Sequence, residues 1–147
     1  MLAGSSLSSE SASAAEPFLR KGVARFRIGL AAYSLRKYFS FMKGKRQTPA
    51  DIAKAIDMPG FIDYCGRKGF EAAELTSYFF PPDADETYFR ELKRHAFLAG
   101  VAIAGTAIGN NFTVGAGPRL EKEVESALQW IDHALFIGAP HIRFFAG

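Results

Sequence analysis

The sequence has little that would commit it to a special environment. Cys65 is the single cysteine, so no internal disulfide forms and nothing requires an oxidising compartment. No run of residues is long and apolar enough to span a membrane. The net charge of +3 is small for a protein that binds nucleic acid. We therefore expect neither a membrane nor a nucleic acid among its partners.

Apolar and aromatic residues are present in quantity. Hydrophobic residues make up 48% of the chain and include 14 Phe, a composition typical of a folded globular protein. Residues 1–17 differ, because they are rich in Ser and Ala without an apolar period, and we expect a disordered tail there. Within the tail, Ala12-Ser13-Ala14 has the form of a signal-peptidase site. If it is the remnant of an export signal, the protein is periplasmic; if the tail is simple low-complexity sequence, the protein is cytoplasmic.

Strand and helix patterns alternate along residues 25–147. Apolar runs with the character of buried strands cover residues 25–33, 70–77, 101–108 and 141–145. The amphipathic segments between them begin at Asp57, at Asp83 or Asp85, and at Pro118. They end at Gly69, Gly100 and Gly138. This alternation predicts βαβ crossovers and a parallel sheet.

Two architectures compete for such a pattern, an open doubly wound sheet and a closed barrel. Doubly wound nucleotide-binding folds usually have a glycine-rich turn after the first strand, and residues 33–39 contain no glycine. The sequence therefore favours a (β/α)8 TIM barrel, of which residues 25–147 would form strands one to four with three helices. We expect a fragment, a truncated reading frame, or a half-barrel that pairs with another chain.

Two segments resemble the second βα unit of the sugar phosphate isomerase/epimerase family, which has the xylose isomerase-like barrel. They are residues 61–64 (FIDY) and 69–81 (GFEAAELTSYFFP), and residues 92–94, 105–112 and 138–147 extend the similarity. The resemblance implies a sugar or keto-sugar isomerase or epimerase that uses a divalent metal (Mn, Mg, Co or Zn). It places the Glu, Asp, His and Glu metal ligands at the ends of strands five to eight, so it assigns no metal ligand to this chain. By this resemblance the chain alone is an incomplete and inactive part of the enzyme, and its partner is a small carbohydrate substrate.

Barrel active sites lie at the carboxyl ends of the strands. That rule selects Glu74 as the candidate catalytic residue. The candidate substrate-binding residues are Tyr33, Ser34, Thr76, Tyr78, Thr106 and Asn110. A carboxylate in an apolar strand is costly to bury unless it is paired or used. Glu74 therefore either binds sugar hydroxyls or transfers a proton next to a carbonyl, or else pairs with Arg27 or Arg143. Thr106 and Asn110 have two open interpretations, hydrogen bonds to a polyol or, for Asn110, ordinary turn chemistry.

Further expectations concern the surfaces and the histidines. The third helix has a predicted buried stripe of Leu120, Val124, Ala127, Leu128, Ile131, Ala134 and Leu135. His95 and His133 are expected at the surface of their helices. The inner faces of the strands are expected to present Phe, Ile, Leu and Val, so the chain would self-associate through its open half-barrel.

Two other functions compete with the isomerase. One is a non-catalytic carbohydrate-binding relative. The other is a metal-dependent abasic-site nuclease of the same barrel type, which would need histidines at the ends of strands three and four. The corresponding residues, 106–108 and 144–146, contain none.

Overall fold

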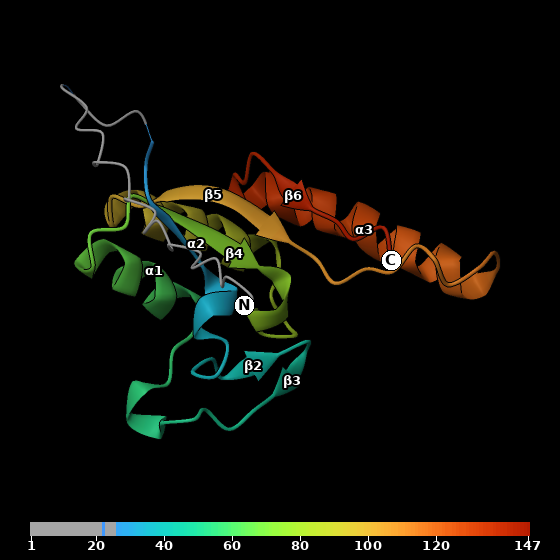
Figure 1. The fold of residues 1–147 in the computed structure, drawn as a ribbon, viewed down its shortest axis with the longest axis horizontal. Coiled ribbons are helices and arrows are strands. Elements are labelled where there is room, and N and C mark those ends of the chain that lie inside the picture. The colour runs from blue at the N-terminus through green and yellow to red at the C-terminus, as the bar shows by residue number, and fades with distance from the viewer. Residues whose placement is uncertain (1–21, 23–25) are drawn as a thin grey trace, which may run out of the picture.

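The computed structural model describes residue 22 and residues 26–147, and these form a mixed α/β fold (Figure 1). The parallel sheet has four strands in the order β1 (Gly29–Ala31), β4 (Ala72–Thr76), β5 (Ala102–Ala107) and β6 (Ile142–Arg143). The connecting helices are α1 (Met58–Arg67), α2 (Glu86–Leu98) and α3 (Pro118–Ile137). The predicted parallel sheet with three helices is therefore confirmed. The predicted tail over residues 1–17 and the Ala12-Ser13-Ala14 site lie outside the described residues.

The helices begin and end where local chemistry predicts. The Asp57 carboxylate accepts a hydrogen bond from the Gly60 amide at 2.8 Å and so caps α1. The Asp85 carboxylate accepts one from the Tyr88 amide at 2.8 Å, which decides between the two predicted caps of α2. Gly138 ends α3 with a φ of 76°, a left-handed conformation that costs glycine little.

The strands are shorter than predicted. The first covers Gly29–Ala31 rather than residues 25–33, because the chain turns into a 3₁₀ helix over Ala32–Leu35. A second 3₁₀ helix over Ser77–Phe79 ends β4, and the last strand, β6, is only two residues long. The strand ends therefore tighten into turns at the edge where the candidate site residues lie.

An antiparallel hairpin lies between β1 and α1, and the sequence did not predict it. Its strands are β2 (Phe41–Met42) and β3 (Lys45–Arg46). Lys43 (φ 51°) and Gly44 (φ 74°) are both left-handed, as a type I′ turn requires. The Lys43 amide donates to the Tyr78 carbonyl at 2.7 Å, which places this turn beside the carboxyl end of β4.

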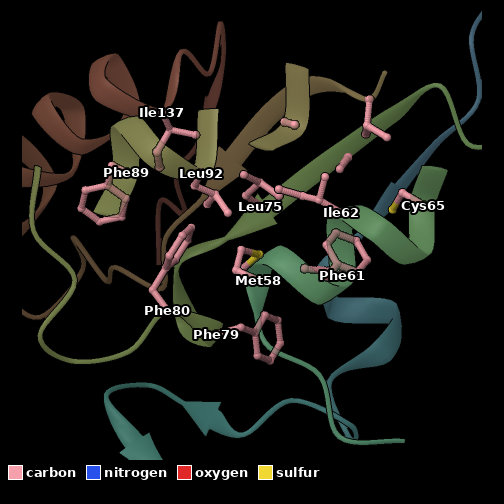
Figure 2. Close-up of a cluster of buried hydrophobic side chains, with 14 of the residues drawn as sticks. Met58, Phe61, Ile62, Cys65, Leu75, Phe79, Phe80, Phe89, Leu92 and Ile137 are labelled. Carbon is pink, nitrogen blue, oxygen red and sulfur yellow. The ribbon is translucent and has the colours of Figure 1, made fainter. Parts of the chain in front are cut away.

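The three helices form one layer, because α1 packs on α2 and α2 packs on α3. The core lies between this layer and the sheet, where Ala73 and Leu75 of β4 are fully buried. Figure 2 shows the helix side chains that meet them, among them Phe61, Ile62, Leu92 and Ile137. Cys65 is a free, buried thiol in the same core, as predicted, and burial raises its pKa to about 11.

The other face of the sheet carries few large side chains. Successive side chains of a strand alternate between faces, so Glu74 and Thr76 point away from buried Leu75. Residues that pair across neighbouring strands lie on the same face of the sheet. The face with Glu74 and Thr76 therefore also carries Gly29, Ala31, Ala72, Ala102, Gly105, Ala107 and Arg143. We call this the helix-free face, since the described helices all lie in the opposite layer. The expectation that it presents Phe, Ile, Leu and Val is wrong; apart from Glu74, Thr76 and Arg143, it is lined by Gly and Ala.

Helix α3 is rotated from its predicted orientation. Ala127 and Ala134 are buried as expected, together with Ile137. The exposed members of the predicted stripe are Val124 (43%), Leu128 (60%), Ile131 (46%) and Leu135 (72%). The buried side instead includes His133, whose ring lies 4.6 Å from that of Phe89 on α2. The surface position predicted for His133 is therefore wrong, because its aromatic ring fills the space between α2 and α3.

His95 is only partly exposed. Its Nε2 lies 2.7 Å from the Asp63 carboxylate and so links α2 to α1. Among the described residues, no helix has both the length and the apolar character needed to cross a bilayer.

Candidate functional site

Glu74 lies on the helix-free face between two small neighbours. Its Cα pairs with Ala31 on β1 and with Gly105 on β5, so no large side chain crowds the carboxyl group from either strand. Oε2 accepts a hydrogen bond from the Thr76 hydroxyl at 2.9 Å. Oε1 is buried and has no hydrogen-bond partner among the described residues. A buried oxygen without a partner is costly in a folded protein, and a ligand would relieve that cost.

The surroundings of Glu74 shift its pKa upward. Burial of the carboxyl group is the main cause, and the Thr76 hydrogen bond and the positive charge of Arg143 oppose it. Arg27 does not pair with Glu74, because its Nε lies 3.7 Å from the Glu71 carboxylate instead. Arg143 acts on Glu74 through space, without an ion pair at 4.0 Å or less between them. The predicted pairing of Glu74 with Arg27 is therefore wrong. The predicted pairing with Arg143 is limited to this long-range attraction.

A β-bulge lies beside Glu74. Ala73 pairs with Ile103, but Glu74 pairs with Gly105, so Ala104 is an extra residue in β5. Gly105 is also tightly packed, because a Cβ there would lie 3.0 Å from the carbonyl oxygen of His141, the residue just before β6. The bulge and the glycine together bring β6 close to β5 at the level of Glu74.

The bulge changes which face Thr106 belongs to. In an unbroken register Thr106 would lie opposite Thr76, on the helix-free face. The extra residue instead places Thr106 opposite Leu75, on the side of the helices. Its hydroxyl donates to the Leu75 carbonyl at 2.5 Å and accepts from Trp130 Nε1 at 3.1 Å. Thr106 thus joins β5 to β4 and α3 and does not lie with Glu74.

Asn110 is also used within the protein. Its amide nitrogen donates to the Phe145 carbonyl at 2.6 Å, and its amide oxygen accepts from the Phe145 amide at 2.9 Å. The side chain therefore replaces a strand partner for the segment after β6. This contact joins segments 35 residues apart, so it is not the turn chemistry expected for Asn110, and the polyol contact stays a prediction.

Tyr33, Ser34 and Tyr78 lie at the carboxyl ends of β1 and β4. The rings of Tyr33 and Tyr78 meet edge to face with centroids 6.4 Å apart, and Ser34 is exposed beside them. Lys43 of the hairpin places its ammonium 4.7 Å from the centre of the Tyr78 ring. The structure therefore brings together Glu74 and Thr76 on one face, with Tyr33 and Tyr78 at the edge of the strands.

Two cations near this edge, Lys43 and Arg143, were not among the predicted site residues. Lys43 was not considered because the hairpin that contains it was not predicted. Arg143 was considered only as a structural partner of Glu74. The sequence did contain evidence for Arg143, because it lies in the predicted fourth strand. In the structure it pairs with Ala107 and so lies on the helix-free face. In residues 26–147, no group of three or more His, Cys, Asp or Glu side chains lies close enough together to bind a metal ion.

No protein-family model matches this sequence, and no curated protein matches it either. The assignment of function therefore depends on the residues and geometry described above.

Proposed function

We propose that this chain forms strands one to four of a (β/α)8 barrel in a sugar or keto-sugar isomerase or epimerase. The strand order supports the barrel, since β1-β4-β5-β6 runs in one direction with the helices in one layer. A doubly wound sheet reverses its order at a switch point and has helices on both faces. The Gly and Ala residues of the helix-free face are smaller than the bulky side chains that a closed barrel usually packs there.

The observation that carries the proposal is the partly buried Glu74 carboxyl group with one unpartnered oxygen. Because burial raises its pKa, the group holds its proton to a higher pH than an exposed glutamate does, which suits proton transfer next to a carbonyl. Thr76 holds Oε2 and so fixes the orientation of the carboxyl group. Oε1 is then free to meet a substrate hydroxyl or the carbon-bound proton.

The divalent metal is predicted only from the resemblance to the proposed family. The described residues do not fit a metal site, because Glu74 is the only carboxylate among the strand residues of the helix-free face. We therefore assign no step to a metal and place its ligands outside the four described strands. The step assigned to this chain is proton transfer at Glu74.

Binding of neutral sugars tests this proposal in the chain itself. A panel of pentoses and hexoses is titrated into labelled protein and followed by the amide shifts of β1, β4 and β5. We expect Glu74→Gln to weaken binding at least tenfold, about 1.4 kcal/mol, because the carboxyl group accepts hydrogen bonds from the sugar. Glu71→Gln is the matched control, since that carboxylate is exposed and paired with Arg27. Equal binding by wild type and Glu74→Gln, or no binding of any sugar, would contradict the proposal.

A further inference from the structure

Arg143 is the second charged side chain of the helix-free face. It lies on β6 in register with Ala107 of β5, and Thr76 of β4 pairs with the same Ala107. Glu74 lies two residues before Thr76 on the same face. Glu74 and Arg143 are therefore on strands β4 and β6, with only β5 between them.

The stretch of β5 between them has almost no side chains. Gly105 pairs with Glu74 and Ala107 pairs with Arg143, so the β5 residues between the two charged groups are glycine and alanine. Neighbouring strands lie about 4.8 Å apart, which separates β4 from β6 by about 10 Å. Because the Glu74 and Arg143 side chains are both long, one small ligand can contact both across that distance.

Both charged groups keep unused hydrogen-bonding capacity. Glu74 Oε1 is buried without a partner. Arg143 forms no ion pair at 4.0 Å or less with any carboxylate of residues 26–147. Its guanidinium lies 4.4 Å from the centre of the Phe145 ring, which steadies the side chain and leaves its N–H groups free to donate.

We propose that Arg143 binds a carboxylate of the substrate, so that the site takes a sugar acid whose hydroxyl or carbonyl end lies at Glu74. This inference rests on the proposed function of the same site. The planar guanidinium fork matches a carboxylate with two parallel hydrogen bonds. A single guanidinium also balances a single negative charge, whereas a phosphate dianion would bring excess negative charge toward Glu74.

Comparison of three ligands tests the inference on the chain as it is. Gluconate, glucose and glucose 6-phosphate are titrated separately and followed by the amide shifts of β5 and β6. We expect gluconate to bind at least tenfold more tightly than glucose, and added salt to weaken only the charged ligands. Arg143→Gln should remove the preference for gluconate over glucose, and Arg143→Lys should restore part of it. Arg27→Gln is the control, because that arginine is exposed and paired with Glu71.

The outcomes separate this inference from the proposed function. Equal affinity for gluconate and glucose, with both lost in Glu74→Gln, would overturn the role of Arg143 and leave the sugar site standing. Tighter binding of glucose 6-phosphate than of gluconate would overturn the choice of a carboxylate. Binding of none of the three ligands would overturn the inference and the proposed function together. An unchanged melting temperature in Arg143→Gln shows that any loss is local.

Discussion

At the scale of single residues, the Glu74 carboxyl group links the site to the stability of the fold. Its pKa is raised in the folded protein, so between the ordinary value of 4.5 and the raised value the folded state binds more protons than the unfolded state. Stability is therefore expected to fall as pH rises through this window. Melting temperatures measured against pH should show that Glu74→Gln removes this decline. Parallel curves for wild type and Glu74→Gln would contradict it, and Glu71→Gln controls for the loss of a surface charge.

Turnover gives a second prediction for the same side chain. In a protein with the whole barrel, Glu74→Gln should lower turnover at least tenfold and keep the fold, because glutamine preserves the shape but cannot transfer a proton. Steady-state kinetics together with melting measure both effects. Wild-type turnover with unchanged melting would remove Glu74 from the catalytic residues.

His133 is expected to give the opposite pH dependence. Its Nδ1 is buried without a partner between the rings of Phe89 and Trp130, and burial lowers its pKa from 6.5, opposed by Asp132. The unfolded state then binds more protons below pH 6.5, so stability is lost as pH falls through the lowered pKa. His133→Phe keeps an aromatic ring there and should reduce this loss in the same melting series. A steeper loss in the variant would show that the imidazole is not the titrating group.

At the scale of secondary-structure elements, the short strand β6 depends on contacts beyond its own pairing. The Thr106 and Ile108 amides donate to the carbonyls of His141 and Arg143, and the Asn110 side chain binds both backbone groups of Phe145. We expect Asn110→Ala to cost about 1–3 kcal/mol and to speed hydrogen exchange at Ile108, because two hydrogen bonds to the backbone are lost. Asn111→Ala is the control, since Asn111 is exposed and its side chain accepts hydrogen bonds only from Thr113 in its own loop. Unchanged exchange at Ile108 would mean that β6 is held by its pairing alone.

The elements also show what the sequence could and could not predict. Asp57, Pro118 and Gly138 gave correct helix ends, because capping and left-handed glycines are decided within a few residues. The hairpin at Lys43 was missed, since its turn lacks the Asn-Gly or Asp-Gly pair that usually marks one. The face of Thr106 was missed because one bulged residue, Ala104, reverses the alternation and depends on contacts between strands. The rotation of α3 was missed because that helix has two neighbouring apolar faces, and only its packing on α2 distinguishes them.

At the scale of the whole molecule, one side of the chain remains unpartnered in the described structure. Helix α3 and the edge strand β6 lie at the same end of the fold (Figure 1), and β6 pairs only with β5 among the described strands. The exposed apolar residues of α3 are Val124, Leu128, Ile131 and Leu135. The side chains of the helix-free face are mostly small, and two of them are charged. We therefore assign the predicted self-association to the end of the molecule that carries α3 and β6.

Light scattering on the purified chain tests this assignment. We expect oligomers or aggregates, and we expect Leu128→Glu with Leu135→Glu to shift the protein toward monomer by placing charges in the contact. Ile52→Glu is the control, because Ile52 is 76% exposed in the 3₁₀ helix Ile52–Lys54, away from α3. A wild-type monomer with cooperative unfolding would show that this end needs no partner.

Because of the bulge at Ala104, β5 contains one residue more than regular pairing with β4 requires. Loss of that single residue would leave Glu74 opposite Gly105 and Thr106 opposite Leu75, so the Trp130 indole would keep its acceptor. Loss of Gly105 instead would bring Ala104 opposite Glu74, where its Cβ would approach the His141 carbonyl oxygen. A one-codon deletion at either position would therefore keep every later side chain of the strand on its present face, and only the second deletion would change the residue beside Glu74.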